Sequence, residues 1–200
     1  AGWRAAAPAV VAVVVAHEPG AWFEETLDSF VTQDYPRLDL VVVDARGGLE
    51  GDVAIDERVR AVAPAATIID AGDTDGFGAA ANTVLETDVA SAFLLVCHDD
   101  VVLAPDAVSI MVTEALRSNI GIAGPKIVHW EKPDLLQHVG LQVDQFAGWA
   151  DVVEVNELDQ EQYDAVTDVF AVPSACLLIR TSLFATIGGF DPGITRRGDA

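Results

Sequence analysis

The chain has 200 residues, 51% of them hydrophobic, and its 32 acidic and 11 basic residues give a formal net charge of −21. Length and apolar content predict one globular domain over residues 1–200 and exclude an intrinsically disordered chain. The negative charge argues against nucleic acids and anionic membrane surfaces as partners, because it would repel them. A phosphate-bearing ligand would need a cation or backbone N–H groups to offset this charge.

Strands and helices are expected to alternate through the first half of the chain. β-Branched and apolar runs predict strands at 10–16, 38–43, 67–70 and 93–97. Segments with helical spacing predict helices between them, at 20–33, 56–63 and 79–86. This alternation predicts an α/β fold with a mostly parallel, Rossmann-like sheet and flanking helices.

Acidic residues follow two of these strands. Asp44 comes directly after the second strand, and His98-Asp99-Asp100 follows the fourth. Parallel α/β sheets bind ligands at the carboxyl ends of their strands. Crowded carboxylates are costly unless they are compensated, and a hard divalent cation would compensate them. We therefore expect a metal site here, with a solvated acidic turn as the alternative interpretation.

The second half is expected to be mixed and rich in loops. Its expected elements are a helix at 105–117, extended pieces at 122–128, 137–144, 166–172 and 176–179, and a short helix at 182–187. Segment 151–164 is strongly acidic and expected to be exposed. Cys97 and Cys176 lie in apolar stretches, so we expect buried free thiols and a reducing, cytoplasmic location. No apolar run reaches membrane-spanning length.

A series of sequence blocks resembles, in order, the blocks of the family 2 glycosyltransferases. They lie at 13–18, 32–36, 40–44, 76–82, 98–100, 124–127, 175–180 and 188–191. The likeness is closest to the branch of bacterial rhamnosyl- and galactofuranosyl-type transferases. It implies a GT-A fold and metal-assisted transfer, with inversion, from a UDP- or dTDP-linked sugar to a saccharide or lipid-linked acceptor. That reaction would serve cell-wall polysaccharide synthesis.

The resemblance also assigns residues to the nucleotide sugar. Asp44 would contact the base or ribose, and glycines in the 76–82 block would let the backbone approach the ligand. The full set is Ala16, His17, Asp44, Gly76, Gly78, Asn82, His98 and Asp99. Ordinary loop and turn roles are the alternative for His17, Asp44 and the two glycines.

The His98-Asp99-Asp100 segment falls on the family's Asp-x-Asp metal motif. The resemblance makes Asp100 the principal ligand of Mg²⁺ or Mn²⁺. His98 stands where the family usually has Asp or Asn, and its imidazole either binds the metal, bonds a ribose hydroxyl or is structural. Lys126 and Arg180 are expected to bond phosphate or acceptor, or to form surface salt bridges.

An inverting transferase needs a carboxylate that takes the proton of the acceptor hydroxyl. The candidates are Asp191 and Asp199. The family's acidic pair would fall at Asp199-Ala200, so either Ala200 replaces the usual base or the pair is offset. The family continues with a helix that this sequence lacks. We therefore expect a piece of a longer protein, attached through other segments to the cytoplasmic face of a membrane.

Two other interpretations stay open. Departures from the family pattern at Ala45, Thr74, His98 and Ala200 favour a catalytically impaired relative that binds a nucleotide sugar without turnover or acts as a scaffold. A nucleotidyltransferase would share the sheet and metal site. It would need a basic loop for the triphosphate, and 16–20 contains no Lys or Arg.

Overall fold

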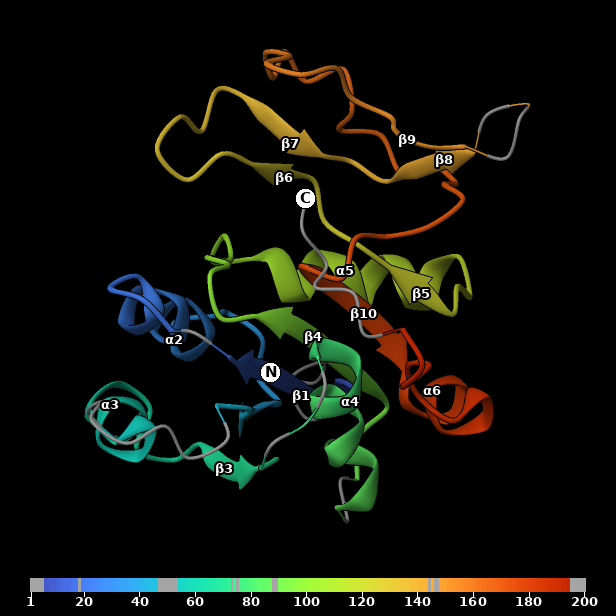
Figure 1. Ribbon diagram of the computed structural model, residues 1–200. Helices are drawn as coiled ribbons and strands as arrows, with labels where there is room; N and C mark the ends of the chain where they lie inside the picture. The colour runs from blue at the N-terminus through green and yellow to red at the C-terminus, as the bar shows by residue number, and fades with distance from the viewer. Residues whose placement is uncertain are drawn as a thin grey trace.

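The protein is built around a six-stranded sheet (Figure 1). The computed structural model describes residues 6–17, 19–46, 54–72, 74, 76–87, 90–143, 145 and 148–194. The strand order is β3-β2-β1-β4-β10-β5. The strands are β1 (Val10–Ala16), β2 (Leu38–Asp44), β3 (Thr67–Asp70), β4 (Phe93–His98), β5 (Ile122–Ala123) and β10 (Cys176–Arg180).

The first four strands run parallel, as the alternation of strands and helices predicts. β1 lies between β2 and β4 and pairs with both in parallel, and β3 extends the sheet beyond β2. β10 is antiparallel to β4 and β5, so the sheet is mainly parallel with one reversed strand. The predicted α/β fold with a mostly parallel sheet is confirmed.

Helices cover both faces of the sheet. On one face α2 (Phe23–Val31), α3 (Ile55–Val62) and α5 (Ala107–Arg117) pack on the even-numbered residues of β1. On the other face α4 (Phe77–Asn82) and α6 (Thr181–Ile187) pack on its odd-numbered residues. Every residue of β1 is buried. This explains why its sequence is a continuous apolar run rather than an alternating one.

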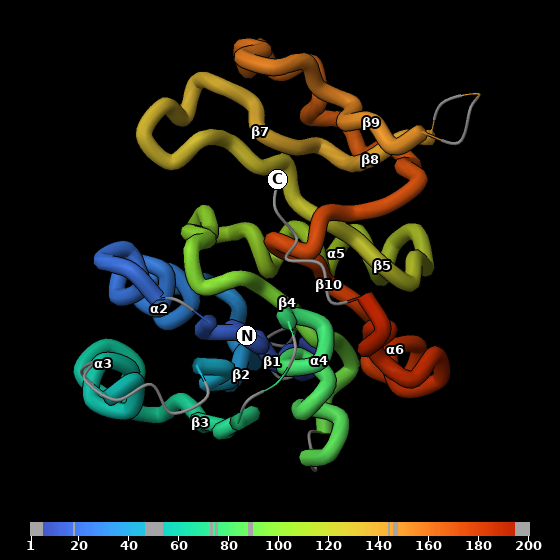
Figure 2. The backbone as a smooth tube through the Cα atoms, viewed as in Figure 1, coloured from blue at the N-terminus to red at the C-terminus, as the bar shows by residue number. Residues whose placement is uncertain are grey.

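The chain from 124 to 174 leaves the sheet and forms a second layer beside α5 and β10 (Figure 2). Two small antiparallel sheets make up this layer, β6 (Ile127–Val128) with β7 (Leu136–His138), and β8 (Leu141–Val143) with β9 (Trp149–Asp151). Lys126 pairs with Asp159 at 2.7 Å and with Asp164 at 2.5 Å, and so ties the acidic segment to the start of β6.

Several element boundaries differ from the predictions. The helix expected at 79–86 begins at Phe77 and continues as the 3₁₀ helix η1 (Thr83–Glu86). The piece expected at 137–144 is divided at Gly140, whose φ is 128° and where a Cβ would lie 2.5 Å from Val169. The strand expected at 166–172 is instead a loop with an isolated bridge from Ala171 to Leu141.

The two cysteines are free and buried, as predicted. They face each other across β4 and β10, with their sulfur atoms 3.4 Å apart. Burial raises the pKa of the Cys97 thiol well above its ordinary value. Within the described residues, no helix is both long and apolar enough to cross a membrane.

The central strand β4 is expected to contribute a large part of the stability. Leu95 is 0% exposed, so Leu95→Ala leaves a cavity and should lower the free energy of unfolding by about 2–5 kcal/mol. The matched control is Leu116→Ala on α5, where the side chain is 52% exposed and the loss should stay below about 0.5 kcal/mol. Urea unfolding measures both variants, and equal losses would contradict this account of the core.

Candidate active site

The carboxyl ends of four parallel strands meet at one edge of the sheet. Ala16 lies beside Asp44, and Asp44 beside Asp70. On the other side of β1, Val15 lies beside His98, the last residue of β4. The sheet therefore gathers the loops that carry the predicted nucleotide and metal residues, although they lie up to about eighty positions apart in the sequence.

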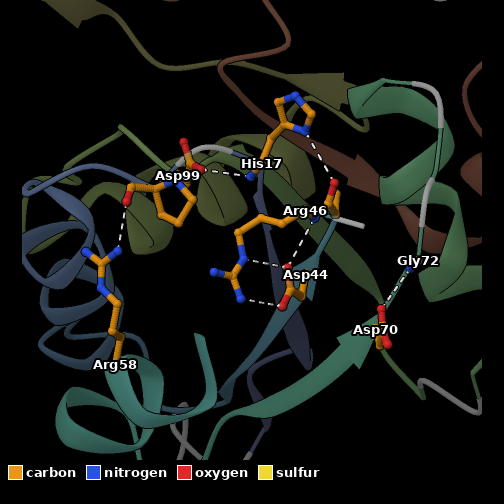
Figure 3. A network of polar contacts seen from close by, with 9 residues as sticks. His17, Asp44, Arg46, Arg58, Asp70, Gly72 and Asp99 are labelled. Atoms are coloured by element: carbon orange, nitrogen blue, oxygen red, sulfur yellow. Dashed lines mark hydrogen bonds and ion pairs between the residues drawn. The ribbon is translucent and has the colours of Figure 1, made fainter. Parts of the chain in front are cut away.

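Asp99 connects three of the elements at this edge (Figure 3). Its Oδ2 accepts a hydrogen bond of 3.0 Å from the backbone N–H of His17. Its carbonyl oxygen accepts one of 3.1 Å from the hydroxyl of Thr26, which is buried in α2. Asp99 thus holds the loop after β1 and the helix α2 against the end of β4. A structural role accounts for this member of the acidic pair.

His17 continues the network toward β2. Its Nδ1 lies 3.3 Å from the carbonyl oxygen of Ala45, an acceptor, so Nδ1 carries the proton in this contact. In the neutral ring Nε2 is then left as an acceptor. The His17 ring is exposed at the edge, where a ligand hydroxyl would reach it. Ala16, by contrast, is fully buried, and its carbonyl oxygen accepts a hydrogen bond of 2.9 Å from the N–H of Ala45, so its contact with the nucleotide sugar stays a prediction.

Asp44 forms a two-pronged ion pair with Arg46, a residue that the sequence analysis did not single out. The guanidinium Nε and Nη2 donate to the two carboxylate oxygens at 3.0 and 2.9 Å. Burial alone would raise the pKa of Asp44, but the hydrogen bonds and charge of Arg46 more than offset this and hold it below its ordinary value. Any base or ribose at this position meets a carboxylate already shared with a guanidinium.

A second arginine, Arg58 of α3, stabilises the loop that leads into α2. It donates to both carboxylate oxygens of Glu24 at 2.6 and 2.8 Å, and to the carbonyl oxygens of Pro19 and Gly20 at 2.7 and 2.6 Å. Its guanidinium also lies 5.0 Å from the ring centre of Phe23. The hydrogen bond from Arg58 lowers the pKa of Glu24. This arginine borders the site but is occupied with the protein's own groups.

The side chain of His98 contains a buried polar atom that the protein does not satisfy. Its Nε2 has no hydrogen-bond partner among the described residues. The ring packs 4.3 Å from that of Phe77, centre to centre. Burial lowers the pKa of His98, and the charge of Asp100 opposes this only in part. A neutral imidazole with an unsatisfied nitrogen suits a ligand hydroxyl or a metal ion.

Asp100 follows as the exposed carboxylate of the pair. No cluster of three or more His, Cys, Asp or Glu side chains suited to a metal occurs in the part of the chain that the structure describes. Nucleotide-bound Mg²⁺ usually takes one or two protein carboxylates and fills its remaining positions with phosphate oxygens and water. The exposed carboxylate of Asp100, whose charge acts on His98, fits a cation of this kind, which would bind together with the nucleotide.

The glycine-rich block and Asn82 face a different neighbour from the one expected. Gly76 has a φ of 89° and precedes α4, and a Cβ on Gly78 would lie 2.9 Å from the Cβ of Phe190. Asn82 exchanges two hydrogen bonds with the backbone of Phe190. The structure thus gives Gly78 and Asn82 a packing role against the 188–191 block. Their contact with the nucleotide sugar stays a prediction.

The structure describes one of the two candidate catalytic bases, Asp191, and both of the cationic residues that the sequence analysis named, Lys126 and Arg180. Asp191 is exposed, and its Oδ1 accepts a hydrogen bond of 2.8 Å from the N–H of Gly193. Asp199 lies outside the described residues, as does Ala200. Lys126 forms salt bridges with Asp159 and Asp164, so the alternative interpretation of this residue, a salt bridge, is the one that the structure shows.

The expectation that Arg180 lies near the site is wrong. β10 is antiparallel to β4, so Arg180 sits beside Phe93 at the opposite edge of the sheet. There its guanidinium donates to the carbonyl oxygens of Ile120 and Ala115 at 2.9 and 3.2 Å.

The Asp44–Arg46 pair has a testable pH dependence. Because the folded pKa of Asp44 is depressed, the stability it contributes is present above its unfolded pKa of about 3.9 and is lost as the pH falls through the lower folded value. In Arg46→Ala the guanidinium hydrogen bonds and charge are lost, so the pKa of Asp44 should rise, and only the backbone N–H of residue 46, 3.2 Å from Oδ1, still opposes burial. We expect a loss of about 1–3 kcal/mol at pH 7 that shrinks as the pH falls below about 5.

Urea unfolding at several pH values and NMR titration of the Asp44 carboxyl measure these two effects. Arg117→Ala is the control, because Arg117 pairs with Glu114 on the surface of α5 and should contribute less than about 0.5 kcal/mol. A pH-independent loss in Arg46→Ala would contradict the assignment.

Comparison with known proteins tests the predicted family. The sequence model of glycosyltransferase-like family 2 matches residues 7–198, nearly the whole chain. No curated protein sequence matches the chain significantly.

Solved structures resemble the fold. The mannosyltransferase PcManGT from Pyrobaculum calidifontis, in complex with GDP-Man and Mn²⁺, has a TM-score of 0.61 at 20% identity over 92% of this chain and 48% of its own. TarS of S. aureus with UDP scores 0.62 at 15% identity, over 95% of this chain and 52% of its own. GalNAc-T7 with UDP, GalNAc and Mn²⁺ has a TM-score of 0.65 at 15% identity, over 94% of this chain and 37% of its own. This chain therefore spans about half or less of the length of these proteins.

The family match covers the strand-end motifs and the 188–191 block, and the structural neighbours share the mainly parallel sheet with flanking helices. The predicted resemblance is confirmed at the level of the family. The chain belongs to glycosyltransferase-like family 2 and has the GT-A fold.

Proposed function

We propose that the protein binds a nucleoside-diphosphate sugar with a divalent cation at the carboxyl edge of β1, β2 and β4, and transfers the sugar to a saccharide or lipid-linked acceptor with inversion. The observation that carries this proposal is the convergence of His17, Asp44 and the His98–Asp100 turn at one edge in a chain of this family. Strand ends of parallel sheets are the usual ligand sites of α/β enzymes.

The cation would be held by Asp100, with the unsatisfied nitrogen of His98 as a second donor. When bound, it would neutralise charge that builds on the departing diphosphate. Mn²⁺ accompanies the nucleotide in two of the similar structures, and Mg²⁺ has the same oxygen preference. In a chain with a net charge of −21, such a cation also offsets repulsion between the protein and the phosphates.

The protein's own groups would orient the donor. We expect the base and ribose to contact the exposed ring of His17 and the Asp44–Arg46 pair, and the backbone at Gly76 and Gly78 to approach the nucleotide sugar. Relatives of similar fold were crystallised with GDP-Man, UDP and UDP-GlcNAc, so UDP, dTDP and GDP are the nucleotides to compare. Asp191 and Asp199 stay the candidate bases that take the proton of the acceptor hydroxyl.

The finer assignments rest on the sequence resemblance. The rhamnosyl- or galactofuranosyl-type branch, bacterial cell-wall polysaccharide synthesis, a cytoplasmic location and membrane attachment through segments outside this chain all stay predictions. So does the assignment of residues 1–200 to a single domain.

A second candidate function is that of a nucleotide-sugar-binding relative without turnover. The departures from the family pattern at Ala45, Thr74, His98 and Ala200 favour it. Turnover of a nucleotide sugar by the protein would exclude this second function. Metal-dependent nucleotide binding without turnover would favour it.

Removal of the exposed carboxylate tests the metal assignment. Asp100→Ala should weaken the binding of UDP, dTDP or GDP in the presence of Mn²⁺ by at least about tenfold, because a principal ligand of the cation is lost. Asp106→Ala is the control, since Asp106 is an exposed aspartate at the N-cap of α5, makes no side-chain cap hydrogen bond and is not among the predicted site residues. Calorimetric titration with Mn²⁺, and then with EDTA, measures the affinities.

Binding that EDTA abolishes in the wild type and that Asp100→Ala weakens would support the proposal. Unchanged binding by Asp100→Ala would contradict the metal assignment. A folded wild-type protein that binds none of the three nucleotides would contradict the proposed function itself.

A further inference from the structure

Two segments that lie 108 positions apart in the sequence are joined by one side-chain amide. The Nδ2 of Asn82, at the end of α4, donates to the carbonyl oxygen of Phe190 at 2.8 Å. Its Oδ1 accepts from the N–H of the same residue, also at 2.8 Å. The amide of Asn82 therefore pairs with one residue's backbone as a neighbouring β-strand would.

The backbone around this contact is shaped to admit the amide. Gly188 and Gly189 end α6 with φ angles of 80° and 81°, a conformation that favours glycine. A Cβ on Gly189 would lie 2.2 Å from the Oδ1 of Asn82, so no side chain fits there while the amide is in place. Gly78 leaves the space that Phe190 fills from the other side. Three glycines thus shape the backbone around the contact between Asn82 and Phe190.

The contact also reaches the metal motif through aromatic rings. The ring of Phe190 lies 5.8 Å from that of Phe77 and 5.3 Å from that of Phe184, both edge to face. Phe77 in turn lies 4.3 Å from the His98 ring. A continuous path of contacts therefore links His98 at the end of β4, helix α4 and the 188–191 block.

We propose that Asn82 is a positioning residue, which fixes the backbone at Phe190 and thereby places the Asp191 carboxylate relative to the donor-side edge of the sheet. This inference rests on the proposed function, in which Asp191 is a candidate base. Asp191 is the next residue after the clamped one and is itself exposed, so the two hydrogen bonds restrain its backbone without touching its side chain. In this inference Asn82 acts on the acceptor side, in place of the nucleotide-sugar contact that the family resemblance assigns to it.

The chemistry of the amide makes the role specific. Asn presents a donor and an acceptor at once, whereas a carboxylate has no donor and would face the carbonyl oxygen of Phe190. A protonated carboxyl group regains the donor. Asn82→Asp should therefore be impaired at pH 8 and recover, relative to the wild type at the same pH, only as the pH falls toward the pKa of the introduced carboxyl, about 3.9 for an ordinary aspartate.

The test compares Asn82→Ala and Asn82→Asp with Thr83→Val as the matched control. Thr83 is the next residue, and among the described residues its hydroxyl bonds only within the same turn, to the carbonyl oxygen of Ala80 at 2.7 Å. In Asn82→Ala we expect kcat to fall by about tenfold to a hundredfold while the donor KM and the Kd for UDP with Mn²⁺ stay within about twofold. Exchange of the Phe190 amide hydrogen should be at least about tenfold faster. Thr83→Val should leave all four quantities near the wild type.

The outcomes separate this inference from the proposed function. A wild type that binds and turns over a nucleotide sugar, with an Asn82→Ala variant of unchanged kcat or unchanged exchange at Phe190, would overturn the inference alone. A parallel loss of kcat and nucleotide affinity would also overturn it, since it would place Asn82 on the donor side. A wild type that binds no nucleotide would overturn the proposed function and this inference with it.

Discussion

The parallel pairing of β1 between β2 and β4 is the constraint on which the rest of the structure depends. β1 is buried along its whole length and covered by helices on both faces. Its own residues are therefore apolar, and polar side chains that could bind a ligand occur only in the loop that follows it. Beside β1, the apolar residues of β4 and the three consecutive valines of β2, Val41–Val43, are buried as well. Because the three strands end together, the loops that follow them meet, and these loops carry His17, Asp44 and the His98–Asp100 turn.

The distribution of charged side chains limits which groups at the carboxyl edge of the sheet can bind a diphosphate. The chain has few cations, and the structure shows the partners of most of those near the sheet. Arg46 and Arg58 are paired with carboxylates, and Lys126 with the acidic segment of the second layer. A diphosphate therefore finds mostly carboxylates at the edge, with cations already committed to the protein. A divalent metal and backbone N–H groups remain to bind the diphosphate, and the exposed carboxylate of Asp100, two residues after His98, suits the metal.

Much of the fold was predictable because its signals are local. Four β-branched or apolar runs separated by helical spacing indicate a parallel sheet, and the acids at strand ends indicate its binding edge. The contacts that refine the site are not local. The hydrogen bonds between Asn82 and Phe190 join distant segments, and the wrong placement of Arg180 follows from a strand direction that periodicity does not reveal. Arg46 carried a weak signal, an arginine two positions after a strand-end aspartate. The short strands of the second layer have two or three residues each, too few for a periodic pattern.

The central claim, a cation site at the carboxyl edge of the sheet, is tested most directly by NMR of the protein with UDP and trace Mn²⁺. The paramagnetic ion broadens the signals of amides close to it. The account predicts broadening around His98, Asp99 and Asp100, and at His17 and Arg46 across the edge. Broadening confined to the exposed acidic segment 151–164, with the edge unaffected, would show that the metal binds to surface charge and would contradict the account.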